Sequence, residues 1–283
     1  MRSHKAKGAV SVGFTPKERY DAQDLVRIVA QLRAPQGGCP WDREQTHASI
    51  RMNFIEETYE AVDAIDQNDA HLLCEELGDV MLQVALHSQM EAEKGTFTFD
   101  DVCDGICKKL IYRHPHVFGE ETAAATTGQA LANWEALKNT EKGRATAKDR
   151  LESVPRSFPA LMRAAKLQKR AGAYGFAYQE PEDALNDVKD ELAELEQAMQ
   201  GRGNAAEEVG DLLFAAAGLA RALGVDPEQV LTGASDRYQS RIIRCEELAG
   251  SEALAGLSDE ERRALWRQAK NEEQSSKVQH LCY

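Results

Sequence analysis

Apolar residues recur every three or four positions along most of the chain, which is the spacing of amphipathic helices. The pattern is clearest on either side of a short polar break at residues 66–69. Before the break it consists of Ile55, Tyr59, Val62 and Ile65, and after it of Leu73, Leu77, Val80 and Val84. Because the break is so short, we expect two antiparallel helices that pack as a hairpin.

The same spacing predicts further helices over residues 22–32, 100–113, 160–169, 181–199, 205–223, 226–248 and 258–271, and one from about residue 129. No strand pattern competes with them, so the predicted fold class is all-α. The 283 residues suggest about two domains on the usual prior of about 150 residues each. We expect a disordered tail at 1–20, domains at 21–150 and 151–273, and a frayed tail at 274–283.

The predicted hairpin carries four carboxylates at helical spacing. Residues three apart share a helix face, so Glu57 pairs with Glu60, and Glu76 pairs with Asp79. Carboxylates that meet across a helix seam repel unless a cation lies between them. Oxygen ligands select a hard ion, so we expect Mg²⁺, with Mn²⁺ as a possible substitute. The plain alternative for each residue is a solvent-exposed helix surface.

A second copy of this pattern argues against the alternative that these carboxylates are only solvent-exposed helix residues. Glu191, Glu194, Glu208 and Asp211 repeat the four carboxylates, and Glu207-Glu208-Val209-Gly210-Asp211 repeats Glu75-Glu76-Leu77-Gly78-Asp79 with a single change. Val102, Gly105, Lys109 and Arg113 recur as Val230, Gly233, Arg237 and Arg241, and Trp134-x-x-x-Lys138 recurs as Trp266-x-x-x-Lys270. The sequence therefore contains an internal duplication.

The duplicated basic and aromatic residues are candidates for nucleotide binding. Lys109 and Arg113 lie four residues apart on one helix face, as do Arg237 and Arg241, and paired cations suit a phosphate chain. Trp134 and Trp266 are either base-stacking surfaces or core residues, and the sequence does not decide between these roles.

Charge and cysteine content narrow the possible partners. The net charge of −13 and the lack of a long basic tract argue against a nucleic-acid or membrane surface. None of the six cysteines forms a Cys-x-x-Cys pair and they do not read as a disulfide framework, which indicates a reducing, cytoplasmic location. We expect Cys103, Cys107 and Trp41 to pack in the core.

In these motifs the chain resembles the MazG-type nucleoside triphosphate pyrophosphohydrolases, an all-α superfamily. The resemblance extends from about residue 24 to 273. Besides the tandem acidic motifs, it includes Gly38-Cys-Pro-Trp-Asp42, Gln45-Thr46, Arg113-His-Pro-His-Val-Phe118 and Pro155-Arg-Ser-x-Pro159. It implies two MazG-like helical bundles completed by homodimerisation, and Mg²⁺-dependent hydrolysis of (d)NTPs to (d)NMP and pyrophosphate. Broad base tolerance and nucleotide-pool housekeeping follow from the same resemblance.

The chemistry predicted from the residues agrees with this resemblance. A metal held by the carboxylates orients a triphosphate, and Glu57, Glu60, Glu191 or Glu194 activates water for attack at the α-phosphorus. The second copy departs from the family pattern in having Asp190 for Glu and Arg237 for Lys. Asp190 and Lys270 remain candidate substrate contacts. The sequence does not tell which copy is catalytic, although the second copy is slightly favoured.

Three other functions compete with this one. A di-iron bundle needs two Glu-x-x-His motifs, and the chain has only Glu44-x-x-His47, outside the acidic helices. A P-loop NTPase needs Gly-x-x-x-x-Gly-Lys-Ser/Thr, which does not occur. A non-catalytic helical scaffold predicts that Glu191→Ala leaves Mg²⁺ and nucleotide binding unchanged.

Overall fold

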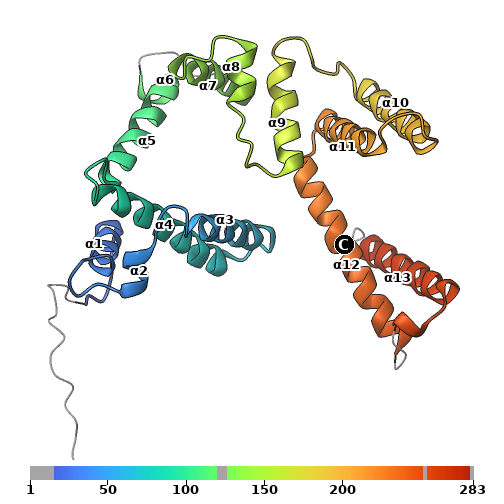
Figure 1. The fold of residues 1–283 in the computed structure, drawn as a ribbon, viewed down its shortest axis with the longest axis horizontal. Helices are drawn as coiled ribbons and strands as arrows, with labels where there is room; N and C mark the ends of the chain where they lie inside the picture. Colours follow the sequence, from blue (N-terminus) through green and yellow to red (C-terminus); the bar gives the residue numbers. More distant parts are fainter. Residues whose placement is uncertain (1–15, 120–125, 251–253, 281–283) are drawn as a thin grey trace, which may run out of the picture. The chain divides into compact units, whose positions relative to one another are not determined.

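The computed structural model describes residues 16–119, 126–250 and 254–280, without the side chains of 275–280. Within these ranges the chain is helical and contains no strand, which confirms the predicted fold class (Figure 1). Parts of the two predicted tails, residues 1–15 and 281–283, lie outside the described residues, as does Cys282. No described helix is both long and apolar enough to cross a bilayer.

The chain divides into two compact units, and the division falls between Glu135 and Ala136. Unit 1 contains α1 (Ala22–Leu32), α2 (Pro40–Glu44), α3 (Arg51–Asp66), α4 (Ala70–Ala92), α5 (Phe99–Arg113), α6 (Pro115–Phe118) and most of α7 (Thr127–Glu141). Unit 2 contains α8 (Ala147–Glu152), α9 (Ala160–Gly172), α10 (Pro181–Met199), α11 (Ala205–Ala222), α12 (Pro227–Ala249), the 3₁₀ turn Leu254–Gly256 and α13 (Asp259–His280).

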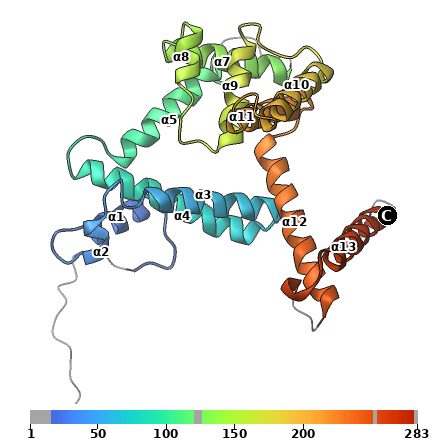
Figure 2. The same ribbon diagram turned by 45° about the vertical axis from the view of Figure 1, so that its right-hand side comes forward.

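Each unit is built around an antiparallel helical hairpin, as the sequence predicted. In unit 1, α3 lies along α4, and in unit 2, α10 lies along α11 (Figures 1 and 2). The first hairpin turns at Asn68, whose φ of 55° is left-handed, and the Asp69 side chain then accepts from the amides of His71 and Leu72. The second turns at Gly201 and Gly203, with φ of 84° and 147°, and Asn204 caps α11. Turn and cap residues therefore fix where each hairpin reverses.

The hydrophobic core of unit 1 lies away from the tip of its hairpin. Val29, Ile50, Ala85, Leu86 and Met90 form it, at the meeting of α1 with the second half of α4. The part of the hairpin nearer the turn has apolar residues on its outer surface instead. Tyr59, Ile65 and Leu77 are 52%, 58% and 50% exposed, so part of the predicted apolar face is uncovered in a single chain.

Some local predictions were wrong. Trp41 is 59% exposed, and Cys103 and Cys107 are exposed on α5, so none of these three residues packs in a core within one chain. The apolar stripe that carries the cysteines is real, but no described element covers it. The short helix α2 precedes α3, and Ile50 occupies the N-cap position of α3 without a side-chain hydrogen bond. Helix α5 begins at Phe99, one residue before the predicted start, and Thr98 caps it through a capping box with Asp101.

Candidate active site

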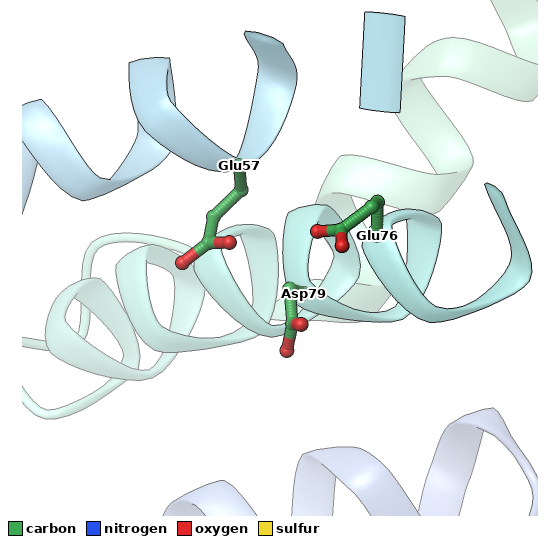
Figure 3. Close-up of side chains that lie close together, drawn as sticks. All are labelled: Glu57, Glu76 and Asp79. Atoms are coloured by element: carbon green, nitrogen blue, oxygen red, sulfur yellow. The ribbon is translucent and has the colours of Figure 1, made fainter. Parts of the chain in front are cut away.

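Three carboxylates meet between the two helices of the first hairpin. Glu57 reaches from α3 toward Glu76 and Asp79, which lie one turn apart on α4 (Figure 3). One oxygen from each of the three lies within 4.8 Å of the others. Such a spacing allows all three residues to be ligands of one cation. We refer to these three residues as the unit 1 triad.

Unit 2 has the equivalent cluster, which we call the unit 2 triad. Glu191 of α10 and Glu208 and Asp211 of α11 also place one oxygen each within 4.8 Å of the others. These are the positions that the internal duplication predicted. The repeat seen in the sequence is therefore also a repeat of side-chain geometry.

The electrostatics of both triads favour binding of a cation. Burial, followed by neighbouring carboxylates, raises the pKa of Glu57 and of Glu76. The same causes raise the pKa of Glu191 and of Glu208. Glu60 and Glu194 complete the predicted sets, since the Glu60 charge raises the pKa of Glu57 and Glu76, and the Glu194 charge that of Glu191 and Glu208. A divalent ion would relieve this repulsion, and an all-oxygen donor set fits Mg²⁺ or Mn²⁺.

The predicted basic and aromatic residues pair in the same way in each unit. The Arg113 guanidinium lies 5.3 Å from the centre of the Trp134 ring, and that of Arg241 lies 5.5 Å from the centre of the Trp266 ring. Both are cation–π contacts. In unit 2 the Arg241 Nε also donates to Glu273, with 2.7 Å between N and O. In each unit an arginine and a tryptophan that are more than 20 residues apart in the sequence are therefore in direct contact.

The four remaining predicted substrate contacts are Lys109, Arg237, Asp190 and Lys270. Lys109 and Arg237 lie one turn before these arginines, and the Arg237 guanidinium packs over Gly233, where a β-carbon would lie 3.4 Å from its Nη1. Asp190 and Lys270 are exposed.

The basic residues and the triads belong to different helix pairs within each unit. The unit 1 triad lies on α3 and α4, whereas Arg113 ends α5, which leaves the hairpin beyond the far end of α4 (Figure 1). In unit 2 the arginines lie on α12, which packs mainly against α13.

A cluster that the sequence reasoning missed joins the loop before α3 to α4. The Nδ1 atoms of His47 and His87 are 2.7 Å apart, the rings stack, and His47 Nε2 lies 2.7 Å from Glu91 Oε1. Lys94 donates to the same oxygen at 2.6 Å. His87 and Glu91 are four residues apart on one helix, and that spacing was the available signal. The only motif in which His47 stands out in the sequence is Glu44-x-x-His47.

Comparison with known proteins gives the family. Residues 45–118 match the MazG nucleotide pyrophosphohydrolase domain, and residues 156–237 match the phosphoribosyl-ATP pyrophosphohydrolase family. A nucleoside triphosphate pyrophosphohydrolase of Escherichia coli (strain K12) is 40% identical over 255 residues, which cover 88% of this chain and 97% of that protein. The chain belongs to the MazG family of nucleoside triphosphate pyrophosphohydrolases. It is therefore a member of a family of hydrolases, as its motifs indicated.

Other MazG relatives show the same correspondence along the chain. The nucleoside triphosphate pyrophosphohydrolase/pyrophosphatase MazG of Thermotoga maritima is 40% identical over 250 residues, covering 88% of this chain and 95% of the relative. The uncharacterized protein YabN of Bacillus subtilis is 42% identical over 254 residues, which are 51% of its own length. The match to two different pyrophosphohydrolase families places each acidic hairpin within a domain of that kind.

Proposed function

We propose that this MazG protein hydrolyses ribo- and deoxyribonucleoside triphosphates to the monophosphate and pyrophosphate. The observation that carries the proposal is the duplicated triad, in a chain whose relatives from E. coli and T. maritima are named for this activity. Phosphoryl chemistry asks mainly for positioning and neutralisation of charge, and both triads are placed to do this through a metal.

The proposed cofactor is Mg²⁺, with Mn²⁺ as a substitute. The residues that would hold it are Glu57, Glu60, Glu76 and Asp79 in unit 1, and Glu191, Glu194, Glu208 and Asp211 in unit 2. When bound, the ion would neutralise phosphate oxygens and polarise the α-phosphorus. The raised pKa values of the glutamates and the short distances between carboxylate oxygens support this assignment.

The carboxylates have a second task in the proposed reaction. A water that attacks the α-phosphorus must lose a proton, and a glutamate carboxylate within hydrogen-bond reach accepts it. Glu57 and Glu191, which are half-buried at the seams of the two hairpins, are the proposed bases. Glu60 and Glu194, one turn later on the same helices, would orient the water or share the metal.

The leaving pyrophosphate would be held by the arginine–tryptophan pairs. Lys109 and Arg113, or Arg237 and Arg241, offer donors to the β- and γ-phosphates and stabilise the charge that develops there. Trp134 and Trp266 hold their arginines and would stack on a base, a contact that tolerates any base. Lys270 and Asp190 are further proposed substrate contacts. Broad specificity would suit housekeeping of the nucleotide pool.

We further propose that the working site forms in a homodimer. The exposed apolar residues on the first hairpin support it, as does the place of Arg113 on α5 rather than on the two helices that carry the unit 1 triad. A second copy would cover the apolar face and supply basic residues to the triads. The net charge of −13 supports small anionic substrates brought in with a metal, rather than nucleic acid or membrane, as partners.

The proposal is tested by product analysis with matched variants. ATP, dATP, GTP, dCTP and UTP are incubated with Mg²⁺ and wild type, Glu57→Ala, Glu191→Ala or the double variant. Asp63→Ala and Glu196→Ala, exposed carboxylates on the same two helices, are the controls. Monophosphate plus pyrophosphate is expected, with the double variant reduced roughly 100-fold or more.

The single variants identify the working unit. Loss in one of them assigns catalysis to that unit, and loss only in the double variant shows that both units turn over. Orthophosphate plus diphosphate would refute the proposal, and no product from any triphosphate would refute it in favour of a helical scaffold.

A further inference from the structure

Unit 2 contains a cavity of about 560 Å³ between α9, the loop that follows α9, and α11. Both views show α9 beside α11 (Figures 1 and 2). Most of the lining is apolar, and it includes Leu151, Leu167, Ala171, Phe176, Ala177 and Phe214. The volume and the lining are typical of a small-molecule site. None of these residues belongs to the unit 2 triad or to the arginine–tryptophan pairs.

A single charged side chain adjoins this apolar lining. Arg221 is the only charged residue among the described residues that line the cavity, and it is half-buried in the last turn of α11. Burial is the main cause that lowers the pKa of its guanidinium. A cation that loses contact with water in this way is normally compensated by an anion.

The described residues supply no such anion. None of them forms a hydrogen bond or an ion pair with the Arg221 side chain, and its electrostatic neighbour is Tyr178. Burial, and then a hydrogen bond with Asp187, raise the pKa of Tyr178 to about 12, so this phenol is neutral at pH 7. The Tyr178 hydroxyl donates that hydrogen bond, with 2.6 Å between the two oxygens. An anion from outside the chain is therefore indicated as the partner of Arg221.

The place of Arg221 on its helix does not account for its burial. A cation in the last turn of a helix interacts favourably with the helix dipole, but an exposed arginine gains the same interaction without losing water. The duplication does not require an arginine either. The position ten residues after the triad aspartate is Gln89 in unit 1, where the side-chain amide donates to Glu93 at 3.3 Å. Arg221 is therefore a feature of unit 2 rather than of the duplicated pattern.

We propose that this cavity binds a small organic monocarboxylate, whose carboxylate pairs with the Arg221 guanidinium while its apolar body lies against Leu167, Phe176 and Phe214. A planar guanidinium matches a carboxylate through two parallel hydrogen bonds. One guanidinium balances one negative charge, and the Asp187 carboxylate, bound to Tyr178, disfavours a second. The ligand is therefore a monoanion with an apolar body rather than a nucleotide. This inference goes beyond the proposed function and requires neither a triad nor a metal.

Calorimetric titration of the full-length protein, without metal or nucleotide, tests the proposal. The probes are octanoate and octanol, which share an alkyl chain and differ in charge. Octanoate is expected to bind saturably at one site per chain, about 10-fold tighter than octanol, the worth of a charge-assisted hydrogen bond. Arg221→Met should weaken octanoate binding about 10-fold, to that of octanol, without weakening the binding of octanol.

Two further variants separate the charge from the cavity. Arg267→Met removes an exposed arginine of α13, outside the cavity, and should bind both probes as wild type does. Ala177→Phe places a larger side chain in the cavity wall and should weaken the binding of both probes. It tests the cavity even if Arg221→Met fails to fold, and circular dichroism melting shows which variants are folded.

Equal affinity for the two probes, or octanoate binding that neither Arg221→Met nor Ala177→Phe weakens, would overturn the proposal. Binding of octyl phosphate that depends on Arg221 and is tighter than that of octanoate would overturn the carboxylate in favour of a phosphate. Loss of octanoate binding as the chain self-associates would make a second copy the occupant of the cavity and also overturn it. Because no readout depends on catalysis, none of these outcomes decides the proposed function.

Discussion

At the scale of single residues, the carboxylates were predictable and their surroundings were not. Glu57, Glu76 and Asp79 follow from helical spacing and a short turn, which bring them to one seam whatever the rest of the chain does. The contact between His47 and His87 depends on the path of a loop with no periodic pattern. The partner of Arg241 was missed for a similar reason, because Glu273 meets it only through the packing of α13 on α12.

The histidine–glutamate cluster predicts acid sensitivity of the fold. Hydrogen bonds from Lys94 and His47 lower the pKa of Glu91 from 4.5 to about 2, so between these values the native protein binds fewer protons than the unfolded chain. Stability should therefore fall as the pH falls from 4.5 to 2. Burial, and then His47, lower the pKa of His87 below 6.5, which adds a loss of stability as the pH falls below that value.

Urea unfolding at pH 7, 5.5, 4 and 3 checks this prediction. Glu91→Gln should flatten the dependence below pH 4.5 while leaving the loss near pH 6 in place. Glu75→Gln, an exposed carboxylate on the same helix, should follow wild type. An acid limb that is the same in Glu91→Gln and wild type would show that this cluster does not control it.

At the scale of elements, both hairpins were predictable because propensity, pattern and caps agree. Asp69 and Asn204 cap the second helix of each, and the bounds of α1 and α10 match those expected from the apolar spacing. The short helices α2, α6 and α8 have 4 to 6 residues, too few for a periodic signal, and were missed. The exposure of Cys103 on α5 was not predictable from periodicity, which marks a face without naming what covers it.

Substitution of Gly78 and Gly210, which lie within helices of the two hairpins, tests whether a second chain covers the hairpins. A β-carbon on Gly78 or Gly210 would meet nothing within 4 Å in a single chain, although interior glycine costs a helix roughly 0.5–1 kcal/mol relative to alanine. Exposed Leu77 and Met81 flank Gly78. We expect a second chain to approach here, so Gly78→Ala and Gly210→Ala should weaken self-association, as measured by sedimentation equilibrium.

Two further glycines are controls for this prediction. Gly128→Ala, near the start of α7 and also without a neighbour within 4 Å, should leave association unchanged. Gly218→Ala should lower the unfolding free energy through its contact with Tyr178. If the two hairpin variants associate normally and gain about 0.5–1 kcal/mol of stability each, the space beside them is open in solution.

At the scale of the whole molecule, duplication and family were predictable because four motifs recur in the same order. The fold of each unit followed from them. How a complete site is assembled did not, because a single chain places Arg113 and the unit 1 triad on different helix pairs. No pattern within one sequence reports contacts between two copies of it.

Mixing of inactive variants tests whether the site is shared between chains. Glu191→Ala removes a triad residue, and Arg241→Ala removes a proposed phosphate contact in the same unit. If two chains build each site, dimers reassembled from an equal mixture should recover about a quarter of wild-type activity, since half are mixed and each mixed dimer has one intact site of two. Activity equal to the sum of the separate variants would place both residues in one chain's site.

The central claim is that the triads direct water to the α-phosphorus, and reaction in ¹⁸O-labelled water tests it most directly. The protein is incubated with dATP and Mg²⁺, and the products are resolved by mass spectrometry. We predict one ¹⁸O atom in the monophosphate, none in pyrophosphate, and no reaction when Glu57 and Glu191 are both alanine. Label in the pyrophosphate, or release of labelled orthophosphate with a diphosphate, would contradict attack at the α-phosphorus.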